Sequence, residues 1–240
     1  MYDYAHVVAE TTATDGTPFR VILEPDIDRT DLNPRDDYSN AGVIHVLDQR
    51  RYDVPQESDV PGIDAAIEEH DFRAVARWLR IFHGATAVLP LYSSYSGNEW
   101  NIAAGDLDDA PEAGDYIGVT YDTAQTRKDT GFVSPVQMAA AMAADVQTYR
   151  SWAEGDVWGH IVQRADLDAD GEITGWDAAD DMGSSCWGFI GQQWAEEAAQ
   201  EALDSVVADY DEQVAERRQQ EADDEEEIDS LRLAELGLPA

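Results

Sequence analysis

The sequence predicts an α+β fold, in which a mostly antiparallel sheet packs with two or three helices and a long acidic helix follows at the C-terminal end. Three observations predict it. Short β-branched and apolar segments are joined by turn signals, a pattern typical of antiparallel strands. Longer segments with apolar residues every three or four positions indicate amphipathic helices. From about Gln192 onwards, a helical pattern continues for more than forty residues.

The predicted strands begin with a hairpin, because residues 5–13 and 19–23 are β-branched and apolar and Asp15-Gly16 between them is a favoured turn. Residues 24–42 are rich in Asp, Asn and Pro, which predicts a long loop before a buried strand at residues 43–47. The remaining strands are expected at residues 86–95, 99–103, 116–121, 157–164 and 185–190.

Two amphipathic helices are expected inside the fold. Residues 63–82 carry apolar side chains at helical spacing and form one helix or a pair broken near His70-Asp71. A second helix is predicted from Ser134-Pro135-Val136-Gln137 to about Ala153. In this start signal the serine caps the helix, the proline takes the first helical position and the glutamine completes a capping box.

The last predicted helix changes character near residue 216. Before that point it has one apolar stripe, made of Trp194, Ala198, Ala202, Val206, Tyr210 and Val214. Residues 221–227 have no apolar face to bury, and their like charges oppose helix formation slightly. We therefore expect a single α+β domain at residues 1–215 and an acidic helical extension or tail at residues 216–240. The closing Leu231, Leu233, Leu236 and Leu238 can dock on the body or on a partner.

The charge balance is extreme, because 51 acidic residues against 15 basic ones give a formal net charge of −36. One explanation is adaptation to high salt, which screens charges to within roughly 3 Å at 1 M; the acidic residues occur in nearly every segment, and Lys128 is the only lysine. The other explanation is mimicry of nucleic acid towards a DNA-binding enzyme. The distribution favours salt adaptation. The charge also argues against direct nucleic-acid binding, which needs a basic footprint.

The sequence predicts a cytoplasmic protein. No stretch approaches the eighteen or so apolar residues of a membrane span, so no membrane partner is expected. The N-terminal residues lack the basic and apolar regions of a signal peptide. A lone Cys186 fits a reducing compartment, and we expect its thiol to be buried rather than reactive.

Residues 166–177 match the spacing of a twelve-residue calcium loop, with a central glycine that permits the bend. The candidate metal ligands are Asp166, Asp168, Asp170, Glu172 and Asp177. The alternative is a plain acidic β-hairpin, because Asp170-Gly171 is itself a favoured turn and the flanking residues are strand-like. The hairpin is the preferred interpretation, so no cofactor is expected, and calcium is the alternative.

The residues give little support for an enzyme, and no catalytic residue is assigned. The five histidines lie singly, and neither a nucleophile elbow nor a phosphate loop is present in the sequence. Cys186 and His160 lie on neighbouring predicted strands and form the one candidate dyad, but a core cysteine and a core histidine are the preferred reading. Core packing is also expected for the aromatic residues Trp152, Trp158, Trp176, Trp187, Phe189 and Trp194.

Several strings between about residues 26 and 200 together resemble a family of small proteins carried by phages and plasmids. They are Asn33-Pro34-Arg35-Asp36, Asn40-Ala41-Gly42, Arg50-Arg51-Tyr52, Leu89-Pro90-Leu91-Tyr92, Ser96-Gly97, Gly118-Val119, Gly155-Asp156-Val157-Trp158-Gly159 and Ser185-Cys186-Trp187-Gly188-Phe189-Ile190-Gly191. The resemblance implies a virus or plasmid of a salt-loving, haloarchaeal-like host. It also implies that the segment between the Gly155–Gly159 string and the Ser185–Gly191 string is a variable connection between two strands, which favours the hairpin interpretation of residues 166–177.

Three functional hypotheses follow. The first is a non-enzymatic accessory protein that binds another protein, with a host defence, restriction or DNA-processing enzyme as the target of an acidic, DNA-mimic-like surface. The second is a structural or assembly protein of a virion, in which the C-terminal helix docks on a neighbouring subunit. The third is a calcium-binding or metal-dependent module that uses the acidic loop at residues 166–177.

Overall fold

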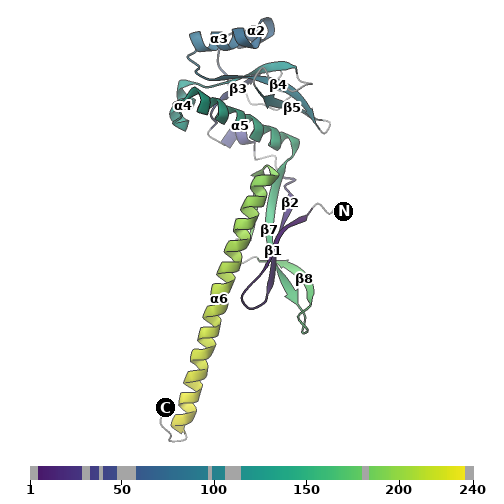
Figure 1. Cartoon of the computed structure of the whole chain (residues 1–240), viewed down its shortest axis with the longest axis vertical. Coiled ribbons are helices and arrows are strands. Elements are labelled where there is room, and N and C mark those ends of the chain that lie inside the picture. Colours follow the sequence, from purple (N-terminus) through teal and green to yellow (C-terminus); the bar gives the residue numbers. More distant parts are fainter. Residues whose placement is uncertain are drawn as a thin grey trace. The chain divides into compact units, whose positions relative to one another are not determined.

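The computed structural model describes residues 5–28, 33–37, 40–47, 58–96, 99–105, 115–179 and 184–235. Their helices and antiparallel sheets, with one long C-terminal helix, confirm the predicted α+β class (Figure 1). The strands are β1 (His6–Thr12), β2 (Pro18–Pro25), β3 (Val43–Val46), β4 (Val88–Ser96), β5 (Glu99–Ala104), β6 (Tyr116–Tyr121), β7 (Val157–Leu167), β8 (Ile173–Ala178) and β9 (Ser185–Ile190). The helices are α1 (Pro34–Asp37), α2 (Ile63–Glu69), α3 (Phe72–Phe82), α4 (Ala124–Thr130), α5 (Pro135–Glu154) and α6 (Gln192–Glu235).

The chain divides into two compact units, a division that the expected domain of residues 1–215 did not include. Unit 1 combines residues 1–26 with residues 158–240, and unit 2 consists of residues 27–157. Unit 1 therefore joins the two ends of the chain, because β2 pairs antiparallel with β7 across a long sequence separation. Unit 2 is inserted between those paired strands in the sequence.

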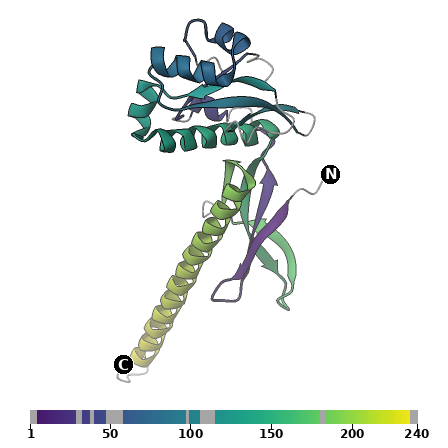
Figure 2. The same cartoon turned by 45° about the horizontal axis from the view of Figure 1, so that its top comes forward.

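Unit 1 is a sheet with one long helix on it. The strand order is β1-β2-β7-β8, and β9 also pairs with β7. Alternate residues of a strand point to opposite faces, and one face buries Phe19, Val21, Leu23 and Val162. The helical residues Ala195, Ala199, Leu203 and Val206 are buried in the same cluster. The core of unit 1 therefore lies between the sheet and the N-terminal half of α6 (Figure 2).

Unit 2 is a three-layer arrangement around the sheet β3-β6-β4-β5. One face carries α2 and α3, and the core there includes Ile67, Leu79, Val88 and Val119. The other face carries α5 through Met138 and Met142, which pack with Leu89 of β4 and with Ala87 just before that strand (Figure 1). Val88 and Leu89 are consecutive in β4, so they face the two different helical layers, as the period of a strand requires.

Two local predictions were wrong. The Ser134 side chain makes no cap hydrogen bond, although Pro135 does begin α5. The capping box lies instead at α4, a helix that was not predicted, where the Thr123 side chain accepts from the backbone N–H of Thr126 and the Thr126 side chain accepts from the backbone N–H of Thr123. This helix has no buried residue and therefore no apolar stripe that periodicity could detect.

The predicted stripe of α6 was also wrong at its N-terminal end. Trp194 is 69% exposed, and the buried positions are Ala195, Ala199 and Leu203. From Val206 to Val214 the predicted stripe is correct. The large side chain of Trp194 was expected on the apolar stripe. The small side chains of Ala195 and Ala199 lie there instead, so the helix backbone can approach the sheet closely.

Two of the glycine- and tryptophan-containing strings pack against each other in unit 1. A Cβ atom added to Gly159 in β7 would lie 2.1 Å from the ring of Trp187 in β9, so the indole lies directly over this glycine. Gly188, at φ +88, allows a change of direction in β9. Beyond it, Phe189 packs beside the α6 core and stacks on His160, with ring centroids 5.3 Å apart. Both strings thus have structural roles.

We expect Gly159→Ala to lower the free energy of unfolding by about 1–3 kcal/mol, because the added methyl group overlaps the Trp187 ring. The matched control is Gly175→Ala in β8, where a Cβ atom would meet only Asp166 Oδ2 at 3.5 Å. Thermal unfolding followed by circular dichroism at molar salt measures both changes. Equal melting temperatures of the two variants would contradict the packing described.

Candidate functional site

The negative charge is concentrated in unit 1. Its residues 1–26 and 158–240 contain 28 acidic and five basic residues, a net charge of −23. Unit 2 is longer, yet its residues 27–157 contain 23 acidic and ten basic residues, a net charge of −13. If the carboxylates were distributed evenly along the chain, the longer unit 2 would carry the larger negative charge. Unit 1 carries it instead, so the distribution is uneven.

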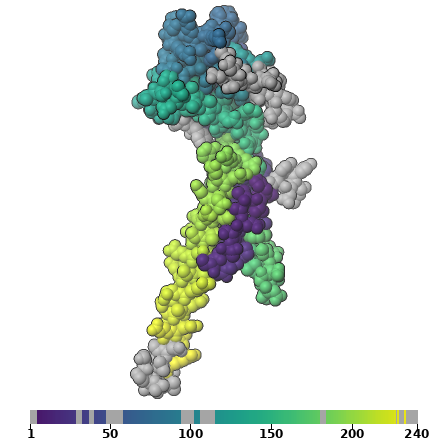
Figure 3. Space-filling view, viewed as in Figure 1, coloured from purple at the N-terminus to yellow at the C-terminus, as the bar shows by residue number. Residues whose placement is uncertain are grey.

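The largest acidic element is α6, in which 16 of 44 residues are acidic and three are basic. Its packing against the sheet ends at Val214, and every side chain from residue 215 to residue 226 is exposed. Figure 3 shows the surface of α6 continuing beyond the β1–β2 hairpin of the same unit. The exposed segment includes Glu216, Glu221, Asp223, Asp224, Glu225 and Glu226.

The point at which α6 leaves the sheet is fixed by polar contacts with the β1–β2 turn. The Tyr210 hydroxyl donates to Asp15 Oδ2 at 2.9 Å, and its ring packs on Phe19 with centroids 5.1 Å apart. The backbone N–H and the hydroxyl of Thr14 both donate to Asp211 Oδ1, each at 2.8 Å. The direction of the exposed segment is therefore set by unit 1.

The charge spacing of α6 is comparable to that of a nucleic-acid strand. A helix of 44 residues is about 66 Å long at 1.5 Å per residue, so 16 carboxylates give one per roughly 4 Å of axis; one strand of B-DNA carries a phosphate per about 3.4 Å. Four glutamine side chains donate to carboxylates four residues later, which reduces the repulsion. These pairs are Gln192 with Glu196, Gln193 with Glu197, Gln200 with Asp204 and Gln219 with Asp223.

The candidate calcium loop is a β-hairpin in the structure. Asp166 of β7 lies opposite Gly175 of β8, and Arg164 lies opposite Asp177. At the turn, Asp168 Oδ1 accepts the backbone N–H groups of Asp170 and Glu172, both at 2.9 Å. In the part of the chain that the structure describes, no group of three or more acidic, His or Cys residues is arranged to hold a metal ion. Calcium binding stays a prediction without geometric support.

The Cys186 thiol was expected in the core and is exposed instead. Its Sγ lies 3.9 Å from the carbonyl oxygen of Trp187. His160 is buried, and burial lowers the pKa of its imidazole. The described residues include no hydrogen bond between the two side chains, so they are not brought together as a dyad. Of the aromatic group expected in the core, Trp152 is buried, whereas Trp187 and Trp194 are exposed.

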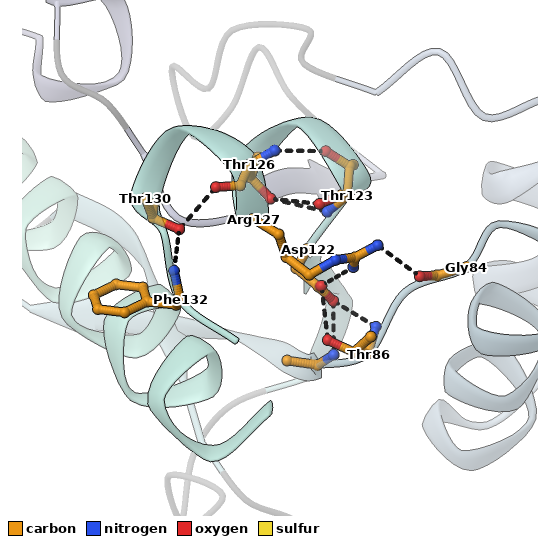
Figure 4. Close-up of polar contacts among 9 residues, drawn as sticks. Gly84, Thr86, Asp122, Thr123, Thr126, Arg127, Thr130 and Phe132 are labelled. Atoms are coloured by element: carbon orange, nitrogen blue, oxygen red, sulfur yellow. Dashed lines mark hydrogen bonds and ion pairs between the residues drawn. The ribbon is translucent and has the colours of Figure 1, made fainter. Parts of the chain in front are cut away.

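A buried carboxylate in unit 2, Asp122, was missed by the sequence analysis (Figure 4). It follows β6 and accepts the backbone N–H groups of Thr86 and Ala87 at 2.7 Å and 2.6 Å. Oδ2 accepts the Thr86 hydroxyl at 2.8 Å and pairs with the Arg127 guanidinium of α4. The only sequence signal for this buried carboxylate is its position between the end of β6 and the Thr123 cap of α4. Because Thr86, Ala87 and Arg127 all donate to it, the Asp122 carboxylate holds β6, α4 and the start of β4 together.

The charges around Asp122 favour its ionised form. Burial by itself raises the pKa of this carboxyl, but the hydrogen bonds from Ala87, Arg127 and Thr86 together outweigh burial, so the pKa lies below its ordinary value of 3.8. All four donors approach from the protein, and the side chain is fully buried. A substrate has no access to the carboxylate, and we interpret it as structural.

The string from Asn33 to Gly42 is also structural. The Asn33 side chain accepts the backbone N–H of Arg35 at 2.9 Å. The buried Arg35 guanidinium donates to the carbonyl oxygen of Gly42 at 2.8 Å, and Asp145 of α5 accepts the backbone N–H of Ala41 at 2.6 Å. These bonds dock the segment on α5. The string at residues 50–52 lies outside the described residues.

Comparison with known proteins does not assign a family: no family model, no curated protein and no solved structure matches the chain. Within the described residues, no helix combines the length and the apolar character needed to cross a membrane.

We expect Asp168→Ala to destabilise the hairpin by about 1 kcal/mol, because two backbone N–H groups lose their acceptor. Asp170→Ala, in the same turn, is the control and should be near neutral, since the structure gives the Asp170 side chain no hydrogen bond. Titration calorimetry with calcium at molar salt should give no binding heat for either variant or the wild type. A heat that only the variants lose would establish the calcium site.

We expect Arg127→Ala to lower the free energy of unfolding by about 1–3 kcal/mol, because Asp122 stays buried without its ion pair. Lys128→Ala on the exposed side of the same helix is the matched control. Urea unfolding at molar salt and neutral pH compares them. Equal stability of the two variants would show that the ion pair contributes nothing.

Stability should also depend on pH through Asp122. Because the folded-state pKa is lowered, the stabilisation is complete above the ordinary value of 3.8 and is lost as the pH falls below it towards the folded-state pKa. Asp122→Asn removes this contribution, so the difference in unfolding free energy between wild type and Asp122→Asn should shrink between pH 7 and strongly acidic pH. A constant difference would contradict the ionised state.

Proposed function

We propose that this chain is an accessory protein of a virus or plasmid that binds another protein, and that its target is a host defence or DNA-processing enzyme with a basic nucleic-acid groove. The observation that carries the proposal is the exposed acidic segment of α6, at residues 215–226, held in a fixed direction by unit 1. A rigid rod of carboxylates offers a groove the charge that it normally receives from phosphates. The proposal assigns no catalytic residue.

The uneven charge supports recognition in addition to salt adaptation. Adaptation of a surface to salt acts on each exposed position alike, so it accounts for the diffuse charge of unit 2. It does not account for the roughly twofold higher charge density of unit 1. At molar salt, screening leaves only interactions within about 3 Å, so binding then requires carboxylates positioned to contact the guanidinium and ammonium groups of the target.

The cellular setting of the proposal comes from the resemblance to phage and plasmid proteins. A salt-loving host explains why a charge of −36 is tolerated. Defence enzymes that bind DNA would be present in the cytoplasm of that host, where the protein would meet them.

The test uses two variants with five carboxylates neutralised in each. The first changes the exposed segment of α6: Glu221→Gln, Asp223→Asn, Asp224→Asn, Glu225→Gln and Glu226→Gln. The control changes five exposed carboxylates of unit 2: Asp36→Asn, Asp59→Asn, Glu68→Gln, Asp115→Asn and Asp129→Asn. The two variants have the same net charge, so any difference between them reports position rather than total charge.

We expect immobilised wild type and the control to retain a DNA-binding or DNA-cleaving enzyme from host lysate at molar salt, and the α6 variant to lose it. Duplex DNA should compete for the retained enzyme. Retention of the same enzyme by the α6 variant, or recovery of no such enzyme by the wild type, would reject the proposal. Recovery of the chain in purified virus particles would instead favour the virion hypothesis.

A further inference from the structure

One helix of unit 2 is basic although the protein is strongly acidic. α3 (Phe72–Phe82) contains no acidic residue and has arginines at positions 73, 77 and 80. These positions are spaced by four and three residues, so they form one stripe along the helix. All three are exposed. The stripe holds three of the 15 basic residues of the chain within eight positions.

The three arginines are unpaired within the described residues. No ion pair or hydrogen bond joins Arg73, Arg77 or Arg80 to any of them, although carboxylates outnumber basic groups in the chain by more than three to one. Other arginines do have partners. Arg127 pairs with Asp122, and Arg150 pairs with Glu154 four residues later. The cationic stripe is therefore available to a carboxylate from elsewhere.

An apolar surface runs along the same helix, one position later in sequence. Ile81 is 60% exposed and Phe82 is 71% exposed. Trp78, one turn before them, lines a pocket of about 360 Å³ between α2 and α3 together with Ala66 and Ala74, and the lining also includes Glu69 and His70. Arginines that contacted only water would not need an exposed apolar surface beside them. The combination of a cationic stripe and an apolar groove fits an amphipathic helix that is acidic.

The chain itself contains a helix of that kind at the C-terminal end of α6. Residues 221–229 contain seven acidic residues, and Ile228 within this segment is 50% exposed. Both features that α3 offers, positive charge and an apolar groove, thus have a counterpart in one short segment.

We propose that the C-terminal end of α6 of a second copy of this chain docks on α3, with its carboxylates on the stripe Arg73, Arg77 and Arg80 and its Ile228 against Trp78, Ile81 and Phe82. Two copies that exchange their helices in this way form a closed dimer with two identical contacts. The contact uses only groups of this chain, but it covers the same acidic segment of α6 that the proposed host target would bind, so the second copy and the target compete for that segment.

The salt concentration determines which interactions between two copies of the chain act beyond direct contact. Two copies that each carry −36 repel one another at low ionic strength. At molar salt this repulsion is screened beyond roughly 3 Å, while guanidinium–carboxylate pairs in direct contact persist. Burial of apolar side chains is strengthened by salting-out ions. The dimer is therefore expected under the conditions for which the acidic surface is suited.

The test is a charge swap between two variants, measured by sedimentation at molar salt over a concentration series. Variant A carries Arg73→Glu, Arg77→Glu and Arg80→Glu, and variant B carries Glu221→Arg, Asp224→Arg and Glu225→Arg. We expect the wild type to reach the mass of a dimer. Each variant alone should dissociate at least about tenfold more readily, the effect of ~1.4 kcal/mol. A mixture of A and B should restore the dimer, because both contacts are then complementary.

The matched control for A adds carboxylates to three exposed positions of α5, with Gln137→Glu, Gln147→Glu and Thr148→Glu, and should remain a dimer. All the substituted positions are exposed, and circular dichroism confirms that each variant folds. A monomeric wild type would overturn the proposal, and so would homodimers of A alone and of B alone that are as stable as the wild-type dimer. Binding of duplex DNA to the wild type that A alone loses would also overturn it and assign α3 to nucleic acid.

The outcome is separable from the proposed host target. Variant A leaves α6 intact, so it should still retain the host enzyme if the proposed function is correct. Variant B changes α6 and should lose both the dimer and the host enzyme. If A loses the dimer and still binds the enzyme, both proposals are supported. If the wild type is a monomer and binds the enzyme, only the dimer proposal is rejected.

Discussion

The structure of unit 1 depends on the packing of a narrow apolar stripe of α6 against its sheet. Ala195, Ala199 and Leu203 lie against strand residues such as Val21 and Val162. A helix with 16 acidic residues gains little from its own sequence, because like charges four residues apart oppose it. Burial of the stripe, at roughly 25 cal/mol per Å² of apolar surface, supplies the stabilisation. The exposed continuation beyond Val214 is helical because the packed half already provides its nucleus.

Small residues make the close contacts of both units feasible. Gly159 leaves room for the Trp187 ring in unit 1, and a Cβ atom on Gly118 in unit 2 would lie 2.0 Å from the carbonyl oxygen of His45. Gly42 is close to Met142 for the same reason. The sequence strings that contain Gly42, Gly118 and Gly159 are thus explained by packing. The functional interest moves to the surfaces that packing does not use.

Two such surfaces have opposite character. The end of α6 is acidic and exposed, and α3 has a cationic stripe, without partners among the residues that the structure describes, beside exposed apolar side chains. Salt adaptation explains a diffuse excess of carboxylates, but it gives no reason to collect three arginines on one helix. The acidity of the protein is therefore divided between a diffuse part, for which salt adaptation is the hypothesis, and a local part at α6, for which we propose recognition.

The sequence by itself determined the α+β class and the opening hairpin, because these follow from turn residues and apolar periodicity. It left open whether residues 63–82 form one helix or a pair broken near His70, and whether residues 216–240 are a helical extension or a tail. It did not determine the position of Trp194, the burial of Asp122 or the exposure of Cys186, since each depends on neighbours distant in sequence. Only the tertiary structure divided the chain into two units, because β2 and β7 pair across the whole inserted unit. The same holds for the arginines of α3: their spacing is readable in the sequence, but their lack of partners is a property of the fold.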